Sequence, residues 1–275
     1  MFITNKIKSV ILPLYRYFTS KLKRNTEISD VLFSLGNGSQ TFGREKFDSF
    51  IGEKLKETKF KANSGPSVSA IYRVKNGAEY IESAILSVAP LVKEIIVVDN
   101  GSTDQTINII ERLKVELEGV TEVKLYHYQK KMELAGDGYL DRLKDNPEGS
   151  LAKFYEYCFN LGTSDYLMKC DAHVIFTLKG LRDIQEALSA NPDIVYFSGT
   201  EIFGKVLDYE PSLFKKSCGY KFIDKEKWEK LEFPEKVKSI YVFSPVFLHL
   251  KRLSYAKYIL NNDASNLAKV KYSDK

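Results

Sequence analysis

The sequence predicts an α/β protein in which helices flank a mainly parallel sheet. Between Val68 and Phe197, short apolar runs alternate with longer amphipathic segments. This alternation produces right-handed strand–helix–strand crossovers and therefore parallel strands. The run 95–98 contains only β-branched residues, which is typical of a strand buried on both faces of such a sheet.

The individual elements follow from the spacing of the apolar residues. Apolar runs predict strands at 68–72, 95–98, 123–128, from 166 to a break at Asp171, and at 194–197. Apolar residues three and four positions apart predict helices at 78–88, 104–117, 151–161 and 178–190. The polar stretch 129–150 is long for a connection, so it is either a functional loop or contains a helix that its composition hides. From Gly199 onward the alternation decays into aromatic and Lys-rich segments.

The first 25 residues are basic, contain no acid, and carry apolar residues at helical spacing. Pro13 should kink or split such a helix. One interpretation is an amphipathic helix that lies on an anionic membrane surface. The alternative is a helix packed on the main domain with its basic side in water. We expect a helical N-terminal extension over 1–65, including a charged helix at 45–60, a main domain over 66–255, and a polar tail over 256–275.

The composition limits the class of protein. The 275 residues are 44% hydrophobic and 28% charged, as in ordinary soluble domains. A net charge of +5 permits anionic ligands, but it does not require nucleic acid, which we do not expect as a partner. The three cysteines show no CxxC spacing and read as reduced thiols. Without a long apolar run or a signal peptide, we expect a cytoplasmic protein, peripheral on the inner face of a membrane if residues 1–25 bind there.

Polar side chains follow three of the predicted strands directly. Ligands of parallel α/β sheets bind at the carboxyl ends of the strands, and Arg73, Asp99 and Asp171 occupy such positions. Asp99 follows four apolar residues, where a carboxylate is costly unless a nucleobase edge or a ribose hydroxyl uses it. The residues after Asp99 (Ser102, Thr103 and Asp104) read as an ordinary turn and helix start.

Asp171 and His173 form a potential metal site. Carboxylate and neutral imidazole are both ligands of Mn²⁺, and the carboxylate also suits Mg²⁺. An ion here would bridge the phosphates of a nucleotide diphosphate. The alternative for this D-x-H pattern is a surface turn. His249 is a candidate third ligand, or an ordinary strand histidine, and Lys153 and Arg73 are candidate phosphate contacts.

Three stretches together resemble the family 2 glycosyltransferases. The segment 68–76 resembles the opening strand and loop of that family. The segment 97–104 resembles its V-V-D-D-G-S-T-D stretch, with Asn100 in place of the second Asp, and the segment 165–173 is similar to the one that ends in a D-x-D metal motif. The resemblance implies a nucleotide-diphospho-sugar transferase of the GT-A fold. The site residues that it implies are Arg73, Val74, Lys75 and Asp99 for the nucleotide, and Asp171 and His173 for the metal–diphosphate, with His173 in place of the commoner Asp.

Members of that family generally invert the anomeric centre, which requires a carboxylate base. The candidates beyond the metal motif are Glu201, Asp208 and Glu210. We prefer Glu210 because the segment 209–214 resembles one in related enzymes, and a solvated loop acid is the alternative for each.

The sequence as a whole favours a metal-dependent glycosyltransferase. It would move a sugar from a nucleotide diphosphate to a glycan or glycolipid acceptor. A nucleotidyltransferase of related fold is a second hypothesis, but it needs a Gly-rich loop after the first strand, and only Gly77 is present there. A non-catalytic glycan- or membrane-binding module is the third.

Overall fold

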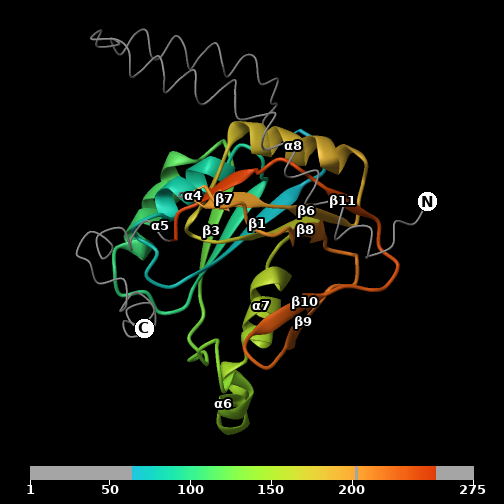
Figure 1. Ribbon diagram of the computed structural model, residues 1–275. Helices are drawn as coiled ribbons and strands as arrows, with labels where there is room; N and C mark the ends of the chain where they lie inside the picture. Colours follow the sequence, from blue (N-terminus) through green and yellow to red (C-terminus); the bar gives the residue numbers. More distant parts are fainter. Residues whose placement is uncertain (1–63, 202–203, 252–275) are drawn as a thin grey trace. The chain divides into compact units, whose positions relative to one another are not determined.

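The computed structural model describes residues 64–201 and 204–251 of the chain. All of these residues belong to one compact unit, Lys56–Lys275. Its centre is a seven-stranded sheet with the order β11-β6-β8-β4-β1-β2-β3 (Figure 1). The strands are β1 (Val68–Val74), β2 (Glu94–Asp99), β3 (Glu122–His127), β4 (Tyr166–Cys170), β6 (Ile194–Phe197), β8 (Glu210–Lys215) and β11 (Ser239–Tyr241). Strand β8 runs antiparallel between β4 and β6, whereas the other neighbours in the sheet are parallel.

Helices cover both faces of the sheet. The described helices are α4 (Ile81–Val88), α5 (Thr106–Glu116), α6 (Tyr139–Asp145), the 3₁₀ helix η1 (Pro147–Gly149), α7 (Leu151–Asn160) and α8 (Leu178–Ser189), of which α4, α5, α7 and α8 pack on the sheet. Helices α4, α5 and α8 pack into one apolar core with one face, and α7 packs into a second core with the other (Figure 1). The predicted fold class, a mainly parallel sheet flanked by helices, is confirmed.

Two small sheets complete the described part of the chain. Strands β5 (Val174–Phe176), β12 (Phe247–His249) and β7 (Gly199–Glu201) form one, with β12 in the middle. Strands β9 (Lys221–Asp224) and β10 (Glu229–Glu232) form a hairpin beside α7 (Figure 1). In the first of these sheets, β12, near the end of the described chain, pairs with β5, which follows the break after β4.

The predicted elements are present with small shifts at their ends. The helix expected from residue 78 begins at Ile81, because the chain makes a turn at Gly77. The stretch 129–150 contains α6 and η1, so the hidden-helix alternative was right. The basic helix expected at 1–25, the helix at 45–60 and the tail over 256–275 lie outside the described residues. The boundaries of the extension over 1–65, of the main domain over 66–255 and of the tail stay predictions. No helix in the described ranges is long and apolar enough to cross a membrane.

One buried carboxylate joins four segments near the amino ends of the strands. Glu94 of β2 accepts hydrogen bonds from Ser69 of β1 at 2.5 Å and from Lys124 of β3 at 2.7 Å. It also accepts from the amide and hydroxyl of Thr163, just before β4, at 2.6 and 2.8 Å. Burial opposes the charge of Glu94, but these donors outweigh it and lower its pKa to about 2. The network fixes three neighbouring strands relative to one another, and thereby aligns their opposite, carboxyl ends.

Candidate functional site

Arg73 lies at the carboxyl end of β1, buried under the site. Alternate residues of β1 pack into the core beside α4, whereas Ile71 packs with α7, so Arg73 points to the α7 side. Its Nη2 donates to Asp171 Oδ1 at 2.8 Å and to the carbonyl of Cys170 at 3.3 Å. Its guanidinium lies 4.3 Å from the centre of the Tyr155 ring, a cation–π contact.

Arg73 stays protonated, although its side chain is only 5% exposed. Burial opposes the charge, but Tyr155 and Asp171 outweigh it and raise the pKa of Arg73 above its usual value. The Nη1 atom is buried and has no hydrogen-bond partner within the described ranges. Arg73 was predicted to contact a nucleotide. The structure shows it holding Asp171, with one donor group still to be satisfied.

Asp171 follows β4 directly, and its side chain is 44% exposed. Burial raises its pKa, but Arg73, His173 and Lys169 together lower it to about 2. His173 Nε2 lies 4.0 Å from Asp171 Oδ2. Burial lowers the pKa of His173 to about 4, against the opposing effect of Asp171. The pair therefore presents an ionised carboxylate and a neutral imidazole, the two protonation states that bind metal ions.

His249 reaches this pair from the far end of the described chain. Strand β12 pairs with β5, and His249 lies opposite Val174, the residue after His173. The two imidazole rings are 4.6 Å apart and meet edge to face. On its other side, His249 Nδ1 lies 3.3 Å from Glu201, whose side chain is 5% exposed. The small sheet thus explains how a distant histidine comes to lie beside His173.

The donor atoms of Asp171 and His173 fit one divalent ion. Two ligands at about 2.1 Å from an ion lie about 3 Å apart when adjacent and about 4 Å apart when opposite, and the observed separation is 4.0 Å. Among the residues that the structure describes, no three His, Cys, Asp or Glu side chains form a ready metal cluster. A two-ligand site is the usual arrangement where substrate phosphates complete the coordination.

Glu210 is the candidate base on the strand next to β4. It begins β8, which pairs with β4, and its carboxylate is 3.6 Å from the ammonium of Lys169 on β4. The pairing between β8 and β6 is irregular near Glu210, and such bulges often re-aim side chains at sites. The side chain of Glu210 is 63% exposed. Of the other two candidates, Asp208 is exposed in the preceding loop and Glu201 is buried behind His249.

Asp99 is buried, but its own turn explains the burial. Its carboxylate accepts the backbone N–H of Gly101 at 3.0 Å and that of Ser102 at 3.2 Å. His127 Nδ1 lies 3.7 Å from the same carboxylate. A carboxylate after an apolar strand was predicted to need a ligand. The turn amides meet most of that need, so burial alone gives no argument for nucleotide contact.

The other predicted nucleotide contacts differ in their access. Val74 points into the core, so only its backbone can meet a ligand, and its carbonyl already accepts the amide of Asn100. Lys75 is exposed at the end of β1. Lys153 lies in the first turn of α7, where its ammonium is 3.1 Å from Glu148. The structure therefore gathers Arg73, but not Lys153, at Asp171.

Two residues of the site carried no clear sequence signal. Tyr155 read only as part of the apolar face of α7. Glu229 begins β10 in the region that showed no regular pattern. Burial raises the pKa of Glu229, against the lowering effects of Lys169 and Arg73, so Lys169 has Asp171, Glu210 and Glu229 as its acidic neighbours.

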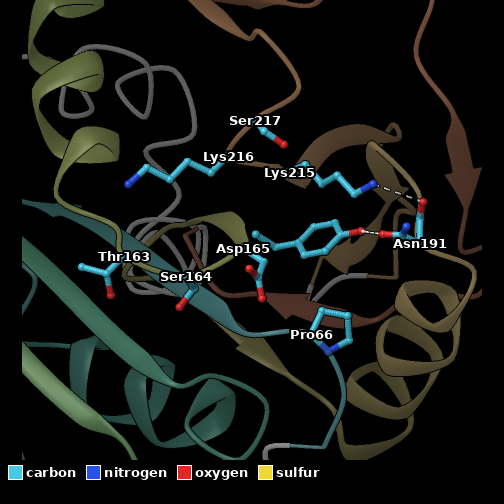
Figure 2. Close-up of a pocket in the computed structure, with 9 residues that line it drawn as sticks. Pro66, Thr163, Ser164, Asp165, Asn191, Lys215, Lys216 and Ser217 are labelled. Atoms are coloured by element: carbon cyan, nitrogen blue, oxygen red, sulfur yellow. Dashed lines mark hydrogen bonds between the residues drawn. The ribbon is translucent and has the colours of Figure 1, made fainter.

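A hollow of about 610 Å³ lies elsewhere, at the amino ends of the strands (Figure 2). Its lining includes Pro66 before β1, Asp165 before β4, and Lys215 and Lys216 at the end of β8. Both lysines have partners, since Lys216 donates to the carbonyl of Gly162 at 2.6 Å and Lys215 lies 3.5 Å from Asp193. The hollow is therefore separated from Asp171 by the length of the strands.

Comparison with known proteins identifies one region of the chain. Residues 69–132 match the model of glycosyl transferase family 2, so the resemblance stated from the sequence is confirmed. This region runs from β1 past β3 and includes Asp99, and it ends before Asp171. No curated protein matches the chain.

Similar solved structures include those of TarS from S. aureus. TarS 1-349 in complex with UDP is 18% identical, with 52% of this chain and 38% of that chain covered and a TM-score of 0.39. TarS 1-349 is 13% identical, with 70% and 62% covered and a TM-score of 0.48. A further structure of TarS is 13% identical, with 66% and 36% covered and a TM-score of 0.48. The chain thus spans less than two thirds of the length of each.

Proposed function

We propose that this chain, whose residues 69–132 match the model of glycosyl transferase family 2, transfers a sugar from a nucleotide diphosphate to a glycan or lipid-linked acceptor. The observation that carries the proposal is the pairing of Asp171 with His173 at the end of β4. The pair lies over a buried arginine, and the strand next to β4 carries an exposed carboxylate beside Lys169. Such a group of side chains at the carboxyl ends of the strands is suited to a phosphate-bearing substrate.

The donor diphosphate would lie over β1 and β4. Asp171 and His173 would hold Mn²⁺ or Mg²⁺, which neutralises the charge of the leaving diphosphate. Arg73 positions Asp171 through the 2.8 Å ion pair, and its unsatisfied Nη1 suits a phosphate oxygen. Following the family resemblance, Asp99 and the backbone of Val74 would line the nucleotide pocket, with the exposed Lys75 at its rim.

The acceptor hydroxyl would approach from the side of β8. Glu210 would take its proton while the hydroxyl oxygen attacks the sugar carbon from the side opposite the leaving diphosphate, which inverts that centre. Glu210 suits this role better than Glu201 or Asp208. It is exposed, and it lies beside Lys169, which is itself a neighbour of Asp171.

Calorimetry tests the proposal through nucleotide binding. UDP, GDP and dTDP are titrated into the full chain with and without Mn²⁺, using the wild type and Asp171→Asn. We expect one diphosphate to bind at least about tenfold more tightly with Mn²⁺, and Asp171→Asn to lose that enhancement. The matched control is Asp141→Asn, which alters an exposed aspartate of α6 that pairs with Lys144.

Other outcomes would favour the rival functions. If no diphosphate binds, the proposal is wrong and a non-catalytic module is favoured. Binding of a nucleoside triphosphate, with release of pyrophosphate in the presence of a sugar phosphate, would identify a nucleotidyltransferase. Equal Mn²⁺ enhancement in the wild type and Asp171→Asn would remove the metal role of Asp171.

A further inference from the structure

Four aromatic side chains gather at the carboxyl ends of β6 and β11, and we call them the aromatic stack. They are Tyr196, Tyr209, Tyr241 and Phe243. Tyr241 of β11 pairs with Tyr196 of β6 across the sheet. The stack therefore lies at the same edge of the sheet as the candidate site.

The geometry of the stack is regular. The rings of Tyr196 and Tyr241 are 4.6 Å apart and within 11° of parallel, and those of Tyr241 and Phe243 are 6.3 Å apart and within 18°. The ring of Tyr209 meets Tyr241 edge to face at 5.7 Å, and its hydroxyl donates to the carbonyl of Phe243 at 2.9 Å. Within this stack, the ring of Phe243 is 47% exposed. A ring held in this way is a rigid contact surface that loses little conformational entropy on binding.

The stack is continuous with the proposed acceptor side of the site. Tyr209 directly precedes Glu210 in the chain, and Glu210 pairs with Phe197, the residue after Tyr196. Since neighbouring strands are about 4.8 Å apart, Tyr241 on β11 lies about 10 Å from β8 across the sheet. A group bound at the stack therefore reaches beyond the sugar whose hydroxyl meets Glu210.

The aromatic stack and the polar side chains next to it, Glu210 and Lys169, favour a carbohydrate as the ligand. The apolar face of a sugar ring can pack on an aromatic ring, while its hydroxyl groups hydrogen-bond to nearby polar groups. Glu210 and Lys169 supply such groups at 3.6 Å from each other. An acyl chain bound over the same side chains would remove water from the charged groups of Glu210 and Lys169 without replacing their hydrogen bonds.

We propose that the aromatic stack binds the sugar unit next to the reacting one, so that the acceptor is an oligosaccharide of two or more units. The inference rests on the proposed function, since it assigns Glu210 to the acceptor side. Phe243 is the specificity-determining contact, because it has the most exposed ring of the stack.

The test measures oligosaccharide binding by the full chain. An array of neutral mono-, di- and trisaccharides is probed, and the tightest binders are titrated by calorimetry. The variants are Phe243→Ala and Phe243→Tyr, and the matched control is Trp228→Ala, which removes another exposed aromatic ring that is 55% exposed. We expect a disaccharide or trisaccharide to bind about tenfold more tightly than its monosaccharide. Phe243→Ala should lose that advantage, whereas Phe243→Tyr and Trp228→Ala should keep it.

Three results would overturn the inference. The first is that no saccharide on the array binds the chain. The second is that Phe243→Ala binds saccharides as Trp228→Ala does. The third is that Phe243→Ala leaves saccharide binding unchanged and instead reduces the fraction of the chain that pellets with anionic liposomes. Nucleotide titrations with UDP, GDP and dTDP in the same variants separate this claim from the proposed function. A wild-type chain that binds nucleotide but no oligosaccharide contradicts the stack alone, and one that binds oligosaccharide but no nucleotide contradicts only the glycosyltransferase.

Discussion

Replacing Glu94 by Gln tests how the sheet aligns the candidate site. The carboxylate is 1% exposed and accepts hydrogen bonds from Ser69, Lys124 and Thr163. Glutamine has the same shape, but it offers one oxygen where the carboxylate offers two. Its amide N–H₂ then faces either the ammonium of Lys124 or the donors of Ser69 and Thr163. The substitution therefore removes a charge and sets donor against donor in a buried place.

The magnitude follows from the pKa of Glu94. It falls from 4.5 to about 2 on folding, and at about 1.4 kcal/mol per unit this contributes about 3 kcal/mol to the free energy of unfolding near neutral pH. Because the pKa is lowered in the folded state, the contribution is complete above the unfolded value of 4.5. It is lost as the pH falls through 4.5 towards 2. At about pH 3, less than half of it remains.

Urea unfolding at about pH 7 and about pH 3 measures the effect. We expect Glu94→Gln to lower the free energy of unfolding by about 3 kcal/mol at the higher pH and by less than half as much at the lower one. The control is Glu122→Gln, since Glu122 pairs with the same Lys124 but is 65% exposed, and it should cost less than about 1 kcal/mol. Equal losses in the two variants, or a loss for Glu94→Gln that does not change with pH, would refute the reasoning.

Two further substitutions test the site and its support. Glu210→Gln should lower the rate of sugar transfer by about 10²- to 10⁴-fold and leave nucleotide binding unchanged. The control, Asp208→Asn, should leave both the transfer rate and nucleotide binding unchanged. A comparable loss of transfer in the two variants would show that Glu210 is not the base. Gly180→Ala should destabilise the fold by about 1–3 kcal/mol in thermal or urea unfolding, because the added carbon would meet the carbonyl oxygen of Val246 at 2.1 Å. Glu186→Ala, at an exposed position of the same helix, is the control, and equal stability of the two variants would contradict the close packing of α8 on that segment.

The first half of the fold could be predicted because each element there has a simple period. Alternation of strand and helix from Val68 to Phe197 is visible in the sequence, and the structure follows it. Helix α6 was hidden because it is only seven residues long, four of them charged, and buries only Tyr139. The strands after Gly199 are three to six residues long, and so short a run carries too few residues to show a period.

The site was predictable where a strand end marks it and less so where partners come from afar. The place of Asp171 and His173 after a strand could be read from the apolar run before them. The role of Arg73 under Asp171 could not, since a basic residue after a strand reads as a surface contact until packing buries it. Glu229 and the rings of the aromatic stack depend on pairings between distant segments, which composition and spacing do not encode.

A crystal of the chain soaked with Mn²⁺ and the diphosphate that binds most tightly tests the central claim most directly. Anomalous scattering locates the ion without reference to the fold. We predict one Mn²⁺ within about 2.0–2.5 Å of Asp171 and His173, with the diphosphate on it and Glu210 facing the open side. An ion and diphosphate bound away from Asp171, for example in the hollow beside Lys215 and Lys216 at the opposite edge of the sheet, would contradict the account.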